Sequence, residues 1–178
     1  FIRGCAKIFD MLKIYIYGEQ ILRKKTRPIT AVTAEISGLL EQMLEVMYKE
    51  KGIGLAAPQV GKNLRLIVVD VGSGPLKLCN PNILKKHGSG CMEEGCLSLP
   101  DLTVNVRRAK KIEAEALNEH NQLIKVVADD LLARTIQHEI DHLDGKLLVD
   151  YLPWYKRWLV KRKLNRVTRN QSTETRKD

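Results

Sequence analysis

The stretch QHEIDHLDG, Gln137 to Gly145, constrains this chain more than any other, because it has the residue spacing of a metal-binding helix. Residues i and i+4 lie on one face of a helix, about one turn apart. His138 and His142 can therefore hold one metal ion, with Glu139 beside it. A catalytic zinc-type site usually has three protein ligands and a water molecule. The chain must therefore fold so that a third ligand reaches this helix.

Size and composition narrow the class of protein. A chain of 178 residues predicts one domain with one core, and a hydrophobic content of 44% excludes a disordered protein. No apolar run approaches the ~18 residues that a membrane span needs, so we expect no membrane contact. The four cysteines are irregularly spaced, which favours reduced thiols inside a cell over a disulfide scaffold.

Hydrophobic periodicity predicts an α+β fold in which antiparallel strands wrap around a central metal-binding helix, followed by a basic C-terminal helix. Apolar residues at helical spacing predict a first helix over Thr33–Glu50, with Thr33 as its N-cap, and Asp129 or Asp130 can cap the metal-binding helix. Gly145 suits the end of that helix. Extended segments are predicted at Arg65–Val71, Leu76–Cys79 and Asn82–Lys86, and a hairpin at Lys111–Leu117 and Gln122–Ala128.

Two other stretches have residue patterns that suggest a functional role in addition to a structural one. In GIGLAAPQVG, Gly52 to Gly61, small residues allow the backbone to approach a ligand, although a plain turn before the next strand is the alternative. In EEGCLSLP, Glu93 to Pro100, Cys96 follows a glycine in a short run that we expect to be extended. A lone cysteine is most often a buried apolar residue. Beside the metal-binding helix, however, a Cys96 thiolate would complete a set of three ligands and leave a fourth position for water.

Together the stretches GIGLAAPQ, EGCLS and QHEIDH, in this order, resemble the three signature motifs of the bacterial-type peptide deformylases. The HExxH pattern alone is common by chance, whereas the three together are specific. The resemblance extends from about Met11 to Lys163. It implies a metal-dependent amide hydrolase that removes the N-formyl group from the initiator formylmethionine of nascent polypeptides and releases formate.

The resemblance also implies a role for individual residues. Cys96, His138 and His142 are the implied metal ligands, and Glu139 is the general acid/base. The implied donors to the oxyanion are the Gln59 side chain and the Leu97 backbone amide. Gly54 is implied to pair with the substrate backbone. The walls of the methionine pocket are expected to be Ile53, Met92, Leu97, Leu131 and Thr135, with plain core positions as the alternative for these five.

One thiolate and two imidazoles suit iron(II), zinc, cobalt or nickel. The resemblance implies Fe(II) as the physiological ion, with zinc often found in purified protein. A ferrous site with a thiolate ligand fits a reducing cytoplasm, which is the expected location. If residues 1–10 were the remnant of a targeting peptide, the location would be an organelle.

The chain departs from the family pattern at several positions. Thr103 stands where many members have an arginine that grips the substrate, with Arg107 and Arg108 just beyond, and Lys51 stands where acids are frequent. The first ten residues precede the usual start of the family, so we expect an N-terminal extension at 1–10. The expected metal-dependent deformylase domain covers 11–153, and a basic helix and frayed tail cover 154–178.

The tail WYKRWLVKRKLNRVTR, Trp154 to Arg169, carries seven lysines and arginines and no acid, within a chain of net charge +9. One interpretation is a solvated terminal helix. The other is a helix that docks on RNA, and the resemblance implies docking on the ribosome near the exit tunnel. Two tryptophans could anchor this helix on the domain or on a ribosomal protein.

Three alternative functions remain at this point. A metallopeptidase would take its third ligand downstream of the HExxH helix, where the tail offers only Asp150. A ribosome- or RNA-binding protein with a structural metal site would have no use for Glu139. The sequence does not distinguish a deformylase from a hydrolase that acts on another small amide.

Overall fold

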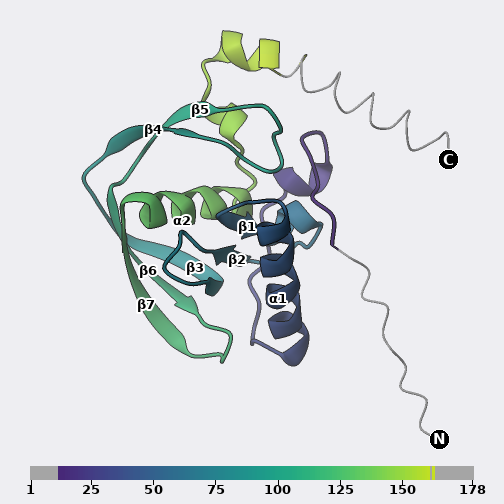
Figure 1. Ribbon diagram of the computed structural model, residues 1–178, viewed down its shortest axis with the longest axis vertical. Helices are drawn as coiled ribbons and strands as arrows, with labels where there is room; N and C mark the ends of the chain where they lie inside the picture. Colours follow the sequence, from purple (N-terminus) through teal and green to yellow (C-terminus); the bar gives the residue numbers. More distant parts are fainter. Residues whose placement is uncertain (1–11, 161, 163–178) are drawn as a thin grey trace, which may run out of the picture.

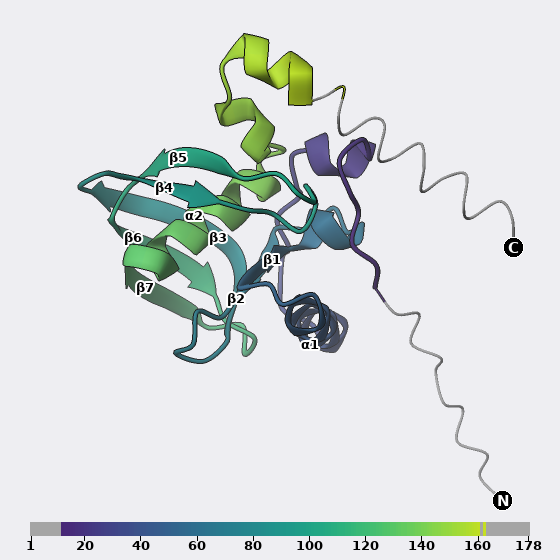
Figure 2. The ribbon, with the colours of Figure 1, turned by 45° about the horizontal axis from the view of Figure 1, so that its top comes forward.

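The computed structural model describes residues 12–160 and 162 of the chain. Within them, helix α2 (Asp130–Leu143) lies in the middle of an α+β fold. A five-stranded antiparallel sheet lies on one side of α2, and a two-stranded antiparallel sheet lies on the other (Figures 1 and 2). The predicted fold class is therefore confirmed.

The large sheet has the strand order β1-β2-β3-β6-β7. Its strands are β1 (Gly54–Ala56), β2 (Leu66–Val69), β3 (Leu76–His87), β6 (Lys111–Leu117) and β7 (Leu123–Asp129). Strand β2 is buried along its whole length, as its continuous apolar run predicts. Strands β6 and β7 form the predicted hairpin, and the Asn118 carboxamide oxygen accepts hydrogen bonds from the amides of His120 and Gln122 in its turn.

Strand β3 differs from the prediction, because two expected segments are one long strand. The register with β6 shifts between Cys79 and Asn82, where Asn80 has a left-handed φ of 52° and Pro81 has no amide to donate. The strand bends at this irregularity and then continues, so the local signal resembled a break between two strands.

The small sheet consists of β4 (Gly90–Glu94) and β5 (Val104–Arg108), neither of which was predicted. In β5 the alternation of buried Val104 and Val106 with exposed neighbours is the signal that could have revealed it. The expectation that Cys96 lies in an extended run was wrong. Strand β4 ends at Glu94, and Cys96 lies just before the turn that carries the chain toward β5.

Helix α1 (Ala34–Lys49) matches the predicted first helix, and the Thr33 hydroxyl accepts a hydrogen bond from the Ile36 amide at its N-terminus. Its buried face packs beside β1 and β2 in one core cluster. Asp129 occupies the N-cap position of α2, but its side chain makes no capping hydrogen bond. Gly145 has a φ of 73° after α2, and a Cβ there would lie 2.5 Å from the Arg23 carbonyl oxygen.

After α2, the 3-10 helix η3 (Leu148–Tyr151) leads into a helical segment over residues 154–160. Trp154 is 83% exposed and Trp158 is 57% exposed, so the two tryptophans do not anchor this segment on the domain. The expected extension at 1–10 and the tail from 163 onward lie outside the described residues. No helix in the described part of the chain is long and apolar enough to cross a membrane.

Candidate active site

Three side chains from two parts of the chain converge beside α2. Cys96 comes from the segment after β4, while His138 and His142 come from successive turns of α2. One ligand atom from each lies within 4.8 Å of the other two, and Sγ of Cys96 is 3.2 Å from Nε2 of His142. One sulfur and two imidazole nitrogens at these separations form a donor set that suits a divalent transition metal.

The carboxylate of Glu94 fixes the orientation of His138. Nδ1 of His138 lies 2.9 Å from Oε2 of Glu94, so Nε2 is the nitrogen left for a metal ion. Burial lowers the pKa of His138, but hydrogen bonds with Cys96 and Glu94 outweigh burial and raise this pKa to about 10. Burial, followed by the charge of His138, lowers the pKa of His142 well below its usual range, so the second imidazole stays neutral.

Glu94 is itself held by two buried arginines. Nε and Nη2 of Arg108 donate to it at 2.6 and 2.9 Å, and Nη1 of Arg134 donates at 2.6 Å. Burial raises the pKa of Glu94, but the hydrogen bonds from His138, Arg108 and Arg134 lower it to about 2. The carboxylate therefore stays ionised at neutral pH and keeps accepting from His138.

Glu139 follows the first histidine and is 3% exposed. Burial raises its pKa to about 7, although the charges of His138 and Arg108 act in the opposite direction. Its Oε2 atom is buried and accepts no hydrogen bond from the described residues. A carboxylate with a pKa near neutrality and a free oxygen can accept and return a proton, as a general acid/base must.

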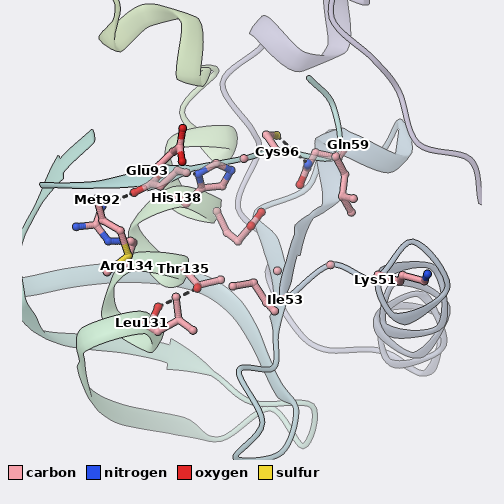
Figure 3. Close-up of a pocket in the computed structure, with 16 residues that line it drawn as sticks. Lys51, Ile53, Gln59, Met92, Glu93, Cys96, Leu131, Arg134, Thr135 and His138 are labelled. Carbon is pink, nitrogen blue, oxygen red and sulfur yellow. Dashed lines mark hydrogen bonds and ion pairs between the residues drawn. The ribbon is translucent and has the colours of Figure 1, made fainter. Parts of the chain in front are cut away.

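Gln59 lies in the 3-10 helix η2 (Ala57–Val60), on the other side of Cys96 from α2. Its Oε1 accepts from the Ala56 amide at 2.7 Å, which leaves Nε2 as the free end of the carboxamide. Nε2 lies 3.6 Å from Sγ of Cys96 and 3.3 Å from the Ser98 hydroxyl. The side-chain amide therefore points at the metal-ligand cluster (Figure 3).

A cavity of about 390 Å³ opens onto this cluster. Its walls include every residue that the sequence proposed for substrate contact or catalysis, whereas the buried His142 does not line it. Ile53 is 44% exposed, Met92 is 50% exposed and Leu131 is 42% exposed, so these three are not core positions. The lining residues named from the sequence are Ile53, Gly54, Gln59, Met92, Cys96, Leu97, Leu131, Thr135, His138 and Glu139.

Gly54 places the backbone of β1 directly against the face of α2 that carries Thr135 and Glu139. A Cβ at this position would lie 2.4 Å from Oε1 of Glu139 and 2.7 Å from Cγ2 of Thr135. Only glycine allows this approach without displacing the Glu139 carboxylate. Strand β1 is also the edge of the large sheet in the described part of the chain, and its first residue, Gly54, lines the cavity.

The departures from the family pattern lie at the rim of the cavity or outside it. Lys51 has a left-handed φ of 56°, and its side chain extends away from the cluster (Figure 3). The Thr103 hydroxyl donates to Glu93 at 2.6 Å. Arg107 does not line this cavity, and Arg108 is buried against Glu94. Neither arginine therefore takes the place of the substrate-gripping arginine that many family members have at the position of Thr103.

The sequence did not predict the roles of Glu94, Arg108 and Arg134. Glu94 is reached by Arg108 across 14 positions, by Arg134 across 40 and by His138 across 44, so local spacing carries no signal for these contacts. The one sequence clue was the pair of acids before Gly95. Asp150 is the downstream acid that the metallopeptidase alternative would need as a ligand. Its carboxylate instead accepts from Arg23 and from the Leu147 amide.

Comparisons with known proteins agree on one family. The family described as "Polypeptide deformylase" matches residues 11–158. A peptide deformylase of Desulfitobacterium hafniense is 49% identical over 143 residues, which cover 80% of this chain and 93% of the relative. A solved peptide deformylase from Legionella pneumophila has a TM-score of 0.85 at 38% identity and covers 91% of this chain and 98% of its own. One from Synechococcus elongatus, in complex with actinonin, has a TM-score of 0.81 at 38% identity, covering 86% of each chain.

Proposed function

Because the chain belongs to the polypeptide deformylase family, we propose that Cys96, His138, His142 and Glu139 carry out its hydrolytic reaction. The chain removes the N-formyl group from nascent polypeptides and releases formate. The observation that best supports the proposed residues is their convergence at one cavity, where Glu139 lies next to a cluster of three metal-ligand atoms.

Cys96, His138 and His142 would hold a divalent ion, which would supply Lewis acidity to the formyl carbonyl and to a water molecule. Glu139 accepts the proton of that water and later delivers it to the leaving amine. Its burial supports this role, because its pKa of about 7 allows both the protonated and the ionised form near neutral pH.

Two donors stabilise the oxyanion of the tetrahedral intermediate in this proposal. One is Nε2 of Gln59, which the Ala56 amide orients by holding the other end of the carboxamide. The other is the backbone amide of Leu97, the residue directly after Cys96, which lines the same cavity. Because this amide is adjacent to Cys96 in the cavity wall, it would lie close to the oxyanion of a substrate bound there.

The substrate peptide would bind as an extended strand along the free edge of β1, with backbone hydrogen bonds at Gly54. Its methionine side chain would enter the part of the cavity lined by Ile53, Leu131 and Thr135, whose side chains point toward one another (Figure 3). Met92 of β4 also lines this cavity. These walls are mostly apolar, as an unbranched thioether side chain requires.

Iron(II) is the ion that we propose for the site in the cell, with zinc, nickel or cobalt able to replace it in purified protein. The donor set of one thiolate and two imidazoles supports any of these ions. We also propose the reducing cytoplasm as the location, where the Cys96 thiolate would stay available as a ligand.

The basic C-terminal segment is proposed to dock the enzyme on the ribosome near the exit tunnel. Its exposed tryptophans support this proposal, because the described part of the segment leaves them free for a partner. Its lysines and arginines, without a single acid from Trp154 to Arg169, suit the phosphates of ribosomal RNA.

The proposed function is tested by formate release from a formyl-methionyl tripeptide, using protein prepared anaerobically with iron(II). Rapid formate release, together with no cleavage of the matching acetyl-methionyl peptide, is the expected result. Cleavage of internal peptide bonds without formate release would instead identify a metallopeptidase. Loading with zinc, nickel and cobalt in the same assay would rank the ions.

A further inference from the structure

A second cavity of about 410 Å³ lies beside α2, on a different face of the helix from the active site. Residues 137, 140, 141 and 144 of the chain line it, whereas residues 131, 134, 135, 138 and 139 line the active-site cavity. These two sets point to different sides of the helix and adjoin at residues 134 and 141. Of the residues that line the second cavity, Arg108 also belongs to the active-site network, because its guanidinium holds Glu94. Arg108 plays no part in the proposal below.

The walls of the second cavity are rich in cations without a carboxylate partner. Lys86 comes from β3, Arg107 from β5 and Lys146 from the segment after α2. In the described part of the chain, none of the three lies within 4.0 Å of a carboxylate. All three side chains are exposed, so their charges can act on a ligand from solvent.

Neutral groups hold two of these cations in place. Nη1 of Arg107 donates to the Ser89 hydroxyl at 3.4 Å, and Nζ of Lys146 lies 3.8 Å from the centroid of the Tyr151 ring. Neither contact neutralises the positive charge. The two side chains are therefore positioned as cations at the cavity without being compensated by an acid.

The negative groups at the cavity are already engaged. Asp141 accepts from Arg108 at 2.9 Å and from the Tyr151 hydroxyl at 2.6 Å, and Asp144 accepts from Arg65 at 2.8 Å. The C-terminal carbonyls of α2 are also occupied, because the Leu143 oxygen accepts from Thr26. The field inside the cavity is therefore dominated by its lysines and arginines.

We propose that this second cavity binds a phosphate group. A phosphate dianion or a phosphodiester can accept from the Arg107 guanidinium and from the two ammonium groups at once. Tyr151, which lines the cavity, is followed after two residues by the helical segment at 154–160, so the cavity lies close in sequence to the basic C-terminal segment. The phosphate could come from an RNA backbone or from a free phosphorylated molecule.

The test compares two charge-matched triple variants of the full-length, metal-loaded protein. The cavity variant is Lys86→Gln, Arg107→Gln and Lys146→Gln. The surface variant is Lys49→Gln, Lys62→Gln and Lys125→Gln, which removes the same charge from exposed positions outside both cavities. Inorganic phosphate is titrated and followed by NMR, and a short RNA duplex is titrated and followed by fluorescence anisotropy.

Phosphate is expected to shift the amide signals of Gly88, Ser89 and Lys146 in the wild type and in the surface variant. The cavity variant should bind at least about fivefold more weakly, the loss expected for three partly exposed charge contacts. Weaker RNA binding by the cavity variant alone, with a shallower salt dependence, would identify a phosphodiester ligand. If the cavity variant bound phosphate more weakly but bound RNA like the wild type, the ligand would be a free phosphorylated molecule.

Equal loss in both variants, or phosphate shifts confined to the active site, would overturn the proposal. Formate release is expected to be the same in all three proteins, because no substituted residue lines the active-site cavity. This readout keeps the test independent of the proposed function, since a chain that failed to release formate could still bind phosphate.

Discussion

Nδ1 of His138 and Oε2 of Glu94 lie 2.9 Å apart, and this contact decides which imidazole nitrogen faces Cys96. Glu94 is in turn fixed by Arg108 and Arg134, both largely buried. A carboxylate held by two arginines cannot rotate away from the histidine without breaking several charge-assisted hydrogen bonds. The orientation of one proposed metal ligand is therefore set by residues that do not touch the metal.

Glu94→Gln should weaken metal binding by about 10- to 100-fold, the usual effect of losing a partner that orients a metal-ligating histidine. The glutamine side chain lacks the negative charge of Glu94. Its NH₂ group would also face the N–H donors of Arg108 and Arg134, which need an acceptor. Zinc affinity measured by competition with a chelator checks this expectation.

The neighbouring acid supplies the control. Glu93 is exposed at the cavity rim and accepts from Thr103 rather than from a histidine. Glu93→Gln should therefore bind zinc like the wild type. Equal affinities for the wild type and Glu94→Gln would show that Glu94 does not position the ligand.

Gly54→Ala should abolish most of the activity while leaving the fold intact. The added methyl carbon would overlap Oε1 of Glu139, and both this carboxylate and Thr135 would have to move. Formate release and thermal unfolding of the same sample separate lost chemistry from lost structure.

Gly38→Ala is the matched change, because a Cβ at this exposed position of α1 meets no atom within 4 Å. It should leave activity unchanged and stabilise the fold by about 0.5–1 kcal/mol, since alanine favours helix interiors over glycine. Wild-type turnover in Gly54→Ala would show that Glu139 tolerates displacement or is not the acid/base.

Loss of the Gln59 amide should lower turnover by about 10²–10³-fold, as for other oxyanion donors. Gln59→Ala also removes the acceptor for the buried Ala56 amide, so it mixes a structural effect with a catalytic one. Gln59→Glu keeps an acceptor for Ala56 and removes the donor. Steady-state kinetics should show a much larger fall in kcat than rise in KM for both variants. A changed KM with an unchanged kcat would place Gln59 in substrate binding.

A chain ending at Pro153 should still hydrolyse short formyl peptides but lose affinity for ribosomes. The segment beyond Pro153 lines neither the active-site cavity nor the metal cluster in the described residues. Binding of the full-length chain should weaken steeply with salt, because phosphate neutralisation releases counterions. Cosedimentation with ribosomes at low and moderate salt measures both effects.

The paired substitution Trp154→Ala and Trp158→Ala refines this test, because it keeps the contacts of Arg157 with the carbonyls of Asp150 and Leu152. It should weaken ribosome binding without changing the fold. Equal cosedimentation of the truncated and full-length chains would identify the segment as a solvated terminal helix.

The sequence predicted the fold class and the central helix well, because both follow from local patterns. Spacing alone placed His138 and His142 on one face of α2, and apolar periodicity located α1, β2 and the β6–β7 hairpin. The extent of β3 was less predictable, because the irregularity at Asn80 and Pro81 interrupts the pattern without ending the strand.

Long-range contacts had no local signal. The sequence does not reveal that Arg108 reaches Glu94 across 14 positions, or that Arg134 reaches it across 40. The sequence also left open whether the C-terminal tryptophans pack on the domain or on a ribosomal protein. Their high exposure excludes only the first of these partners. These features depend on how the elements pack, which periodicity does not encode.

The most direct test of the proposed chemistry is the turnover of Glu139→Gln with its metal content measured on the same sample. Cys96, His138 and His142 are unchanged in this variant, so it should hold a full complement of metal. Loss of the general acid/base should lower formate release by at least about 10²–10⁴-fold. Near-wild-type turnover in a fully loaded Glu139→Gln protein would contradict the account, because another group would then have to move the proton.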